Sequence, residues 1–301
     1  MPALRVVITG ATGQLGIELI QLLEEEDYFE VIGLGRKDMD ITDYDQVEKK
    51  MVELMPDIII HTAAYTNVDS AEDDPDTAFL VNGTGTENLA IMASKLKAKL
   101  VYISTDYVFS GEVNRPISEL ETPSPISVYG RSKLAGETYI RKHLEQFFII
   151  RTSWVYGLHG NNFVKTMLEL SEKRNQIMVV DDQIGSPTYT LDLAKCILLL
   201  MVTEKYGIYH VSNEGSCSWY EFAKAIFEEA DIDMNVTPCE TTEFPRKAPR
   251  PKYSVLMETA LSANGFPKMR NWGDALAHFF EKFAQNSSDK NNHGKRLAEK
   301  N

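Results

Sequence analysis

Short apolar runs alternate with amphipathic stretches through the first half of the chain. The apolar runs are rich in β-branched and aromatic residues and have the length of strands: 4–9, 31–34, 58–61, 100–104 and 147–151. Between them, apolar residues recur at helical spacing over 16–26, 44–54, 76–97 and 129–144. Nearly continuous apolar strands separated by helices are typical of a parallel sheet covered on both faces. The pattern therefore predicts an α/β fold with a Rossmann-type, doubly wound parallel sheet.

The pattern becomes looser after about residue 160. Helical spacing appears over 162–174, 191–203, 218–229 and 272–283, with short strand-like runs at 178–180 and 208–211. Prolines break this part into short units. We expect one domain over residues 1–160 and a smaller mixed α/β domain over 161–284, which returns a strand to the first domain. Residues 285–301 have almost no apolar side chains and are predicted to be a disordered polar tail.

Composition and charge exclude several classes of protein. Lys and Arg total 31 against 44 Asp and Glu, a net charge of −13, so a nucleic acid or an anionic membrane is not an expected partner. The longest apolar stretch near the middle, 196–202, is too short to span a bilayer, and the N-terminus lacks the layout of a signal peptide. Three widely spaced cysteines without a CxxC pair predict a reducing compartment and no disulfide or zinc site. We expect a soluble cytoplasmic protein.

A glycine-rich loop follows the first predicted strand. It reads Gly10-Ala11-Thr12-Gly13-Gln14-Leu15-Gly16 and leads into a helix. Glycines let the backbone turn tightly and approach a pyrophosphate, whose charge sits at the helix N-terminus. The spacing GxxGxxG departs from GxGxxG, but its place between the first strand and a helix favours dinucleotide binding over a simple tight turn. Residues 1–160 are thus expected to bind a dinucleotide and residues 161–284 mainly the substrate.

The residues after the second predicted strand bear on the choice of cofactor. An NAD-specific site usually has an acidic residue here for the ribose hydroxyls. This chain has Arg36 and Lys37 instead, two cations that suit a 2′-phosphate. The alternative is that both are solvated loop charges. NADPH is therefore the expected cofactor, and the use of NADH stays open.

Tyr129 and Lys133 stand four residues apart at the start of a predicted helix, so both side chains lie on one face. An ammonium near the phenol is expected to lower the phenol's pKa from about 10, giving a useful acid near neutral pH. The fourth predicted strand leads into Thr105, at the strand end where open α/β sheets bind ligands. The Thr105 hydroxyl can hold a substrate carbonyl oxygen there, or it can bond to its own backbone.

With these residues the chain resembles the extended short-chain dehydrogenase/reductase superfamily. The resemblance covers nearly the whole chain, to about residue 284. Within this superfamily, the chain resembles the dTDP-4-dehydrorhamnose reductases, which make dTDP-L-rhamnose. The resemblance rests on motifs that follow the family's order: STDYVFSG (104–111), SPISVYGRSKLAGE (124–137), RTSWVYG (151–157), NNFVKTML (161–168), DDQIGSPT (181–188) and RPKYSVL (250–256).

The resemblance implies a reaction and a role for each site residue. NADPH would reduce the 4-keto group of dTDP-4-dehydro-L-rhamnose (dTDP-6-deoxy-L-lyxo-4-hexulose), with Tyr129 as proton donor, Lys133 on the nicotinamide ribose and Thr105 on the carbonyl oxygen. The implied cofactor-binding residues are Gly10, Thr12, Gly13, Gln14, Leu15, Gly16, Arg36, Asp40, Ile41, Ala63, Ala64, Tyr65, Tyr129 and Lys133. The implied substrate-binding residues are Thr105, Asp106, Trp154 and Arg250, the last for the diphosphate.

Other functions stay open. Dehydratases of the superfamily have a Thr-Asp-Glu pattern at this strand end, where the chain reads Thr105-Asp106-Tyr107. A dehydratase is therefore disfavoured, because Tyr107 cannot replace the carboxylate base. Epimerases tend to be serine-rich there, a pattern from which the chain also departs. Another sugar-nucleotide reductase or epimerase is a second candidate. A non-catalytic nucleotide-binding subunit, similar to the methionine adenosyltransferase β subunit, is a third, and it would bind the cofactor without turnover.

Some members of this family dimerise around a divalent cation held by glutamates. Glu18 stands where such a ligand could lie, but the later segment 189–191 offers no carboxylate. We therefore expect no structural metal and a monomer or weak homodimer. His61, His159 and His210 show no metal-ligand spacing and are expected to be structural.

Overall fold

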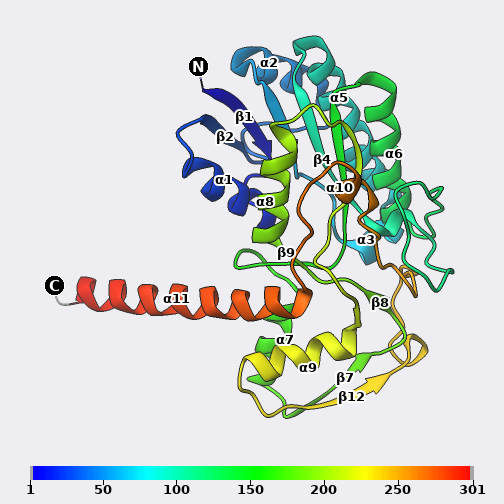
Figure 1. Cartoon of the computed structure of the whole chain (residues 1–301), viewed down its shortest axis with the longest axis vertical. Coiled ribbons are helices and arrows are strands. Elements are labelled where there is room, and N and C mark those ends of the chain that lie inside the picture. Colours follow the sequence, from blue (N-terminus) through cyan, green and yellow to red (C-terminus); the bar gives the residue numbers. More distant parts are fainter. Residues whose placement is uncertain (1–2, 299–301) are drawn as a thin grey trace.

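The centre of the molecule is a six-stranded, entirely parallel sheet, seen in a computed structural model that describes residues 3–298 (Figure 1). Its order is β10-β5-β4-β3-β1-β2. The strands are β1 (Leu4–Thr9), β2 (Phe29–Leu34), β3 (Ile58–His61), β4 (Lys99–Thr105), β5 (Phe147–Thr152) and β10 (Gly207–His210). The predicted Rossmann-type sheet is thereby confirmed.

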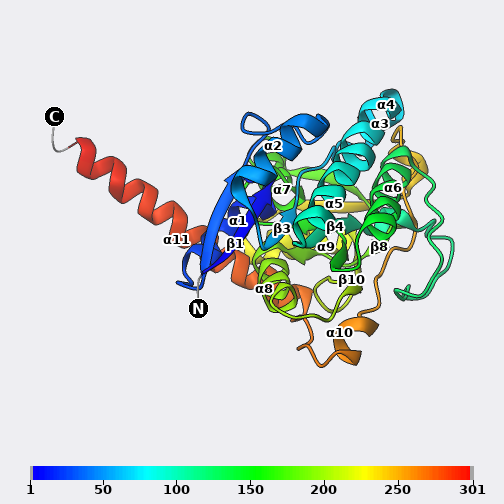
Figure 2. The same ribbon diagram turned by 90° about the horizontal axis from the view of Figure 1, so that it is seen from above.

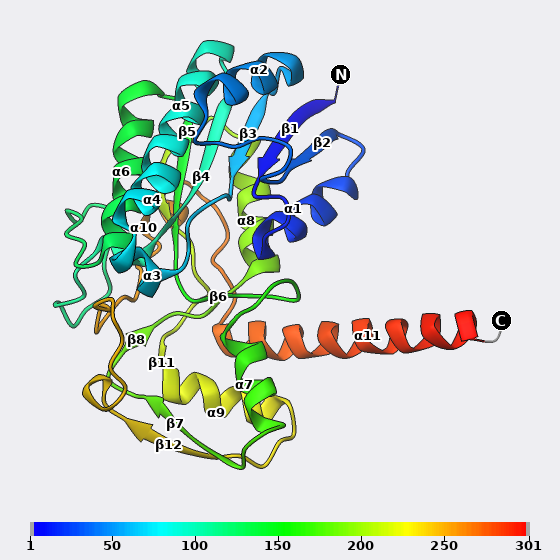
Figure 3. The same ribbon diagram turned by 180° about the vertical axis from the view of Figure 1, so that it is seen from behind.

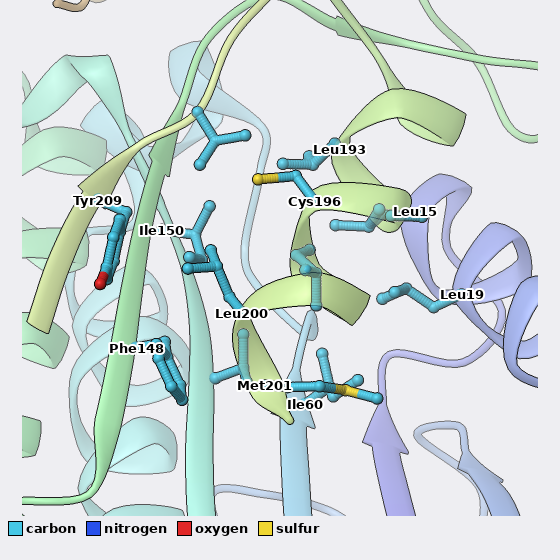
Figure 4. Close-up of a cluster of buried hydrophobic side chains, with 14 of the residues drawn as sticks. Leu15, Leu19, Ile60, Phe148, Ile150, Leu193, Cys196, Leu200, Met201 and Tyr209 are labelled. Atoms are coloured by element: carbon cyan, nitrogen blue, oxygen red, sulfur yellow. The ribbon is translucent and has the colours of Figure 1, made fainter. Parts of the chain in front are cut away.

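Helices cover both faces of this sheet, as Figures 1 and 2 show. One face carries α1 (Gln14–Glu24) and α8 (Thr190–Met201). The other carries α2 (Tyr44–Leu54), α5 (Gly85–Leu96) and α6 (Val128–His143). Side chains of a strand alternate between the faces, so Ile8 packs in the first layer and Val7 in the second. Figure 4 shows the first layer, in which side chains of α1 and α8 close over the sheet: Leu15, Leu19, Leu200 and Met201.

A second core lies beyond the carboxyl ends of the strands (Figures 1 and 3). Its elements are β6 (Val155–Tyr156), α7 (Phe163–Ser171), β7 (Gln176–Val180), β8 (Ile184–Gly185), β9 (Thr188–Tyr189), β11 (Cys217–Ser218), α9 (Trp219–Glu229), β12 (Asn235–Cys239), η3 (Thr241–Glu243) and the first turns of α11 (Trp272–Ala298). Tyr156, Phe222 and Phe279 are fully buried in it. Two later elements, α8 and β10, belong to the central sheet layer although they follow residue 160 in the chain. The division into domains at residue 160 stays a prediction.

Helix α11 continues into the segment expected to be a disordered tail. Ala275, Leu276 and Phe279 anchor its first turns in the second core. The helix then runs on to Ala298 and projects away from the rest of the chain (Figures 1 and 3). Disorder of the tail over 285–301 stays a prediction, and residues 299–301 lie outside the described part.

The strand order places a ligand site at the ends of β1 and β3. The chain passes from β1 outward to β2 and then returns to the opposite side of β1 as β3, and open α/β sheets bind ligands outside such a switch point. At this point Thr9 Oγ1 lies 2.8 Å from His61 Nδ1, and His61 Nε2 lies 3.1 Å from Thr86 Oγ1. Burial lowers the pKa of His61 to about 3, so the ring is a neutral structural bridge, as expected.

Candidate active site

The glycine loop between β1 and α1 leaves no room for a side chain at Gly10 or at Gly16. Gly10 has a φ of 74°, and a Cβ there would lie 2.6 Å from the Ala63 nitrogen. A Cβ on Gly16 would lie 2.3 Å from the Gly10 carbonyl oxygen. Helix α1 begins at Gln14 without any side-chain cap on its N-terminal N–H groups. Free N–H groups and the helix dipole attract an anion, so this cradle fits a pyrophosphate.

The end of β2 carries charges of both signs. Arg36 and Lys37 are exposed there, as a site for a 2′-phosphate requires. However, the Gly35 N–H donates to Asp38 Oδ2 at 2.8 Å, so a carboxylate folds back onto the strand end. The sequence analysis missed this carboxylate because Asp38 lies beyond Arg36 and Lys37 in the chain, and only the fold brings its side chain back to Gly35. The Asp40 carboxylate accepts hydrogen bonds from Thr42 that lower its pKa, with a smaller contribution from Arg36.

The remaining predicted cofactor residues lie on loops held by buried amides. The Ile41 carbonyl oxygen accepts a hydrogen bond at 2.9 Å from Nδ2 of Asn88, a residue of α5. After β3, past Ala63 and Ala64, the Tyr65 backbone bonds to both ends of the Asn82 amide at 2.8 and 3.1 Å. Asn82 lies in the π-helix η1 (Leu80–Thr84) and also donates to Ser132 Oγ of α6 at 2.9 Å. Sequence reasoning missed Asn82. The sequence offers one indication of its role, a polar amide side chain inside a stretch with helical spacing of apolar residues.

The structure brings Thr105 and Tyr129 together. Thr105 ends β4 and Tyr129 lies in the first turn of α6, and the Thr105 hydroxyl is close enough to the Tyr129 phenol to lower its pKa. The Thr105 hydroxyl also donates to Asp106 Oδ1 at 3.0 Å and accepts from the Tyr107 N–H at 3.2 Å. Gly130 permits this approach, because a Cβ there would lie 2.1 Å from the Tyr107 carbonyl oxygen. A proton donor and a second hydroxyl therefore face one spot at the carboxyl edge of the sheet.

The acidity of Tyr129 differs from the expectation. Burial raises its pKa to about 12, although the hydrogen bond with Thr105 opposes the shift. The prediction that Lys133 lowers this pKa is wrong, because the Lys133 ammonium lies over the Tyr102 ring, 4.1 Å from its centre. Burial lowers the pKa of Lys133 itself to about 7, against the pull of Glu137 one turn further along α6. A phenol with this pKa keeps its proton at neutral pH, which is the state of a proton donor.

The predicted substrate residues have well-defined surroundings. Asp106 is buried, and burial raises its pKa to about 6. Trp154 adopts a left-handed φ of 48° and stacks on Trp219, with ring centres 3.5 Å apart. Arg250 forms a bidentate pair with Asp69 at 2.9 and 3.1 Å. Asp106 thus lies directly beside Thr105, whereas Trp154 and Arg250 are each held by a partner that sequence reasoning did not find.

A buried ion pair lies beneath Tyr129 and Thr105, the two predicted catalytic hydroxyl groups. Arg151 donates to Glu137 at 2.7 and 3.0 Å, and each side chain is 2% exposed. Ser104 Oγ donates to the same carboxylate at 2.5 Å, and Arg151 Nη1 lies 3.5 Å from His210 Nε2. The network therefore joins α6 to β4, β5 and β10. It fixes the helix that carries Tyr129 against the strand that ends at Thr105.

Glu18 is buried in α1 and accepts a hydrogen bond from Thr190 Oγ1 at 3.1 Å, and burial raises its pKa. Among the described residues, no group of His, Cys, Asp and Glu side chains is placed to hold a metal ion. The same part of the chain has no helix long and apolar enough to cross a membrane. All three cysteines are free and buried.

Comparison with known proteins identifies the family. Residues 4–285 match the family described as RmlD substrate binding domain. The spore coat polysaccharide biosynthesis protein SpsK of Bacillus subtilis is 46% identical over 277 residues, 92% of this chain and 97% of SpsK. A dTDP-4-dehydrorhamnose reductase of Aggregatibacter actinomycetemcomitans is 39% identical over 90% of this chain and 97% of its own length.

A solved structure agrees with this match. The dTDP-4-dehydrorhamnose reductase of Bacillus anthracis, solved in complex with NADP, has a TM-score of 0.92 and 49% identity to this chain. The alignment covers 93% of this chain and 99% of that one. Since the family match spans almost the whole described chain, the protein belongs to the RmlD substrate-binding domain family.

Proposed function

We propose that this protein is an NAD(P)H-dependent dTDP-4-dehydrorhamnose reductase, which converts dTDP-4-dehydro-L-rhamnose to dTDP-L-rhamnose. The observation that carries the proposal is the pairing of Tyr129 with Thr105 at the carboxyl end of β4, on the same edge of the sheet as the glycine cradle after β1. The reductases of A. actinomycetemcomitans and B. anthracis support the substrate, and the NADP complex of the latter supports the cofactor.

The residues present fit a dinucleotide. The uncapped start of α1 and the loop from Gly10 to Gly16 would hold the pyrophosphate, and Arg36 with Lys37 would take the 2′-phosphate. Lys133 would bind the nicotinamide ribose from α6, on the same helix face as Tyr129. When bound, NADPH supplies the hydride for the reduction.

The side chains of the chain supply the proton and the stabilisation of charge. As carbon four of the sugar gains a hydride, its oxygen gains negative charge, and the Tyr129 phenol transfers its proton to that oxygen. The Thr105 hydroxyl turns its proton from Asp106 Oδ1 to the same oxygen and donates a hydrogen bond to it while the charge develops. Burial keeps Tyr129 protonated at neutral pH, and the phenolate left behind recovers its proton from solvent. Positioning of both hydroxyl groups by β4 and α6 lowers the barrier further.

The direct test is turnover. Purified protein is mixed with NADPH and the 4-keto sugar nucleotide, made in situ by the upstream enzymes, and the near-ultraviolet absorbance of NADPH is followed. The proposal predicts oxidation of NADPH that depends on both the sugar and Tyr129. NADPH binding without oxidation would instead support a non-catalytic regulatory subunit, a role disfavoured by the assembled Thr105–Tyr129 pair.

Arg36 is expected to select for NADPH. The Arg36→Ala variant should raise the KM for NADPH by roughly tenfold or more, because a charge-assisted contact to the 2′-phosphate is lost. The KM for NADH should change by less than about twofold, since NADH lacks that phosphate. Steady-state kinetics with each cofactor measure the difference. Lys49→Ala removes an exposed cation of α2 and serves as the control. Equal effects on both cofactors would mean that Arg36 does not contact the phosphate.

Three further properties belong to this proposal. The free, buried cysteines support a cytoplasmic location, where thiols stay reduced. The name of the B. subtilis relative supports the use of the product in a cell-surface polysaccharide. We also propose that the protein is a monomer or weak homodimer and that it needs no structural metal. Sedimentation velocity measures the oligomeric state, which should be the same with and without a chelator.

A further inference from the structure

We propose that Asp69 is a positioning residue for the substrate: it holds one edge of the Arg250 guanidinium and leaves the other edge to bind the diphosphate of the sugar nucleotide. This inference rests on the proposed function, because it takes a nucleoside diphosphate sugar as the substrate. The two residues are 181 positions apart in the chain. Their pairing therefore exists only in the folded molecule.

The hydrogen bonds of Arg250 occupy one side of its guanidinium. Nη1 donates to Asp69 Oδ1 at 3.1 Å, and Nη2 donates to Asp69 Oδ2 at 2.9 Å. The second N–H of Nη1 donates to the Ala248 carbonyl oxygen at 3.0 Å. Among the described residues, Nε–H and the second N–H of Nη2 have no partner. These donors form the other bidentate edge of the planar guanidinium, and such an edge binds a pair of phosphate oxygens.

Asp69 is itself held firmly. Besides the two bonds from Arg250, its carboxylate accepts from the Ala248 N–H at 3.1 Å. The bond from Arg250 lowers the pKa of Asp69, so the carboxylate is charged at neutral pH. Asp69 belongs to α3 (Val68–Asp73), and Glu72 of the same helix accepts from the Val128 N–H at 2.7 Å. Helix α3 thus ties the support of Arg250 to the first turn of α6, where Tyr129 lies.

Arg250 lies within electrostatic reach of Tyr107, which packs against Tyr129. Burial raises the pKa of Tyr107, and Asp106 adds to that shift while Arg250 opposes it. The Tyr107 ring in turn lies edge-on to the Tyr129 ring, with centres 5.6 Å apart. The side chains of Arg250 and Asp69 are 19% and 32% exposed, so a ligand from solvent can reach the pair.

The backbone after Arg250 is also fixed. Gly111 has a φ of 72°, and a Cβ on it would lie 2.4 Å from Cβ of Pro251. The Tyr253 N–H donates to the Gly111 carbonyl oxygen at 3.2 Å. With the backbone held at this point, the side chain of Arg250 is the remaining source of conformational freedom. Asp69 removes it before the ligand arrives, which lowers the entropic cost of binding.

Calorimetric titration with dTDP, without cofactor or 4-keto sugar, tests the proposal. Arg250→Ala should weaken dTDP binding roughly 10- to 100-fold, through loss of charge-assisted hydrogen bonds. Asp69→Asn should weaken it roughly 3- to 10-fold, the effect of freeing one long side chain. In the double variant, D69N should add nothing to R250A, because Asp69 acts only through Arg250. In turnover, D69N should raise KM by the same factor and leave kcat within about twofold.

Asp73→Asn is the matched control. Asp73 lies on the same helix and pairs with Lys247 of the same loop, with both side chains more than half exposed, so D73N removes an equal charge without touching Arg250. It should bind dTDP as the wild type does. Unchanged binding in D69N overturns the proposal, and so does tighter binding, since Asp69 would then compete with the phosphate. A wild type that binds NADPH but not dTDP contradicts the proposed substrate class and the inference with it.

Discussion

Tyr129→Phe is expected to lower kcat by roughly 10²- to 10⁴-fold, the range for loss of a general acid. The phenylalanine ring fills the same half-buried space, but the oxygen at carbon four of the sugar no longer receives a proton from the protein. Affinity for NADPH should stay within about twofold, because the glycine cradle and Arg36 are untouched. Single-turnover kinetics at saturating cofactor measure the chemical step directly.

Tyr107→Phe is the matched control for this variant. Tyr107 lies edge-on to Tyr129, with ring centres 5.6 Å apart, and is similarly buried. Removing its hydroxyl should change kcat far less than removing that of Tyr129. A Tyr129→Phe enzyme that turns over at the wild-type rate would show that the proton comes from elsewhere. In that case the assignment of Tyr129 would have to be abandoned.

Glu137→Ala is expected to destabilise the fold by about 3–5 kcal/mol, the cost of breaking a buried ion pair from one side. Arg151 would keep a charge that is 2% exposed and would lose both hydrogen bonds to the carboxylate. Ser104 would lose its acceptor as well. Urea unfolding followed by circular dichroism gives the free energy of unfolding. The surviving folded fraction should also show a lower kcat, because the network fixes α6 against β4.

Two controls separate burial from charge. Lys268→Ala breaks an exposed ion pair with Glu214 and should cost less than about 1 kcal/mol. Replacing both members, Glu137→Leu with Arg151→Met, should recover much of the lost stability, because no unpaired buried charge is left. If Glu137→Ala costs no more than Lys268→Ala, the buried pair contributes nothing to stability and its proposed structural role is wrong.

The strands and the catalytic spacing could be predicted because both are local in sequence. Strands β1 and β3 were predicted residue for residue, since β-branched runs buried on both faces differ sharply from their neighbours. Helix α2 was predicted over the same residues, and in the structure Asp43 caps its N-terminus. Tyr129 and Lys133 share a face because helical geometry fixes residues four apart. These features need no knowledge of the remaining chain.

Features that depend on tertiary contacts could not be predicted. The single helix expected over 76–97 is divided into α4 (Pro75–Phe79), η1 and α5, because a π-turn leaves no trace in periodicity. Strand β12 was missed, since it is mostly exposed and contains Pro238. The pairs Asp69–Arg250 and Glu137–Arg151 join distant segments. The pKa of Tyr129 was predicted in the wrong direction because burial raises it, while the Lys133 ammonium lies over the Tyr102 ring instead.

The central claim is that a hydride goes to carbon four of the sugar while Tyr129 protonates the oxygen. NADPH deuterated at the transferable position of its nicotinamide tests this claim most directly, with the product analysed by NMR and mass spectrometry. The account predicts dTDP-L-rhamnose that carries one deuterium, bonded to carbon four, and no such product from Tyr129→Phe on the same timescale. Deuterium at another carbon, or consumption of the cofactor without a deuterated sugar, would contradict it.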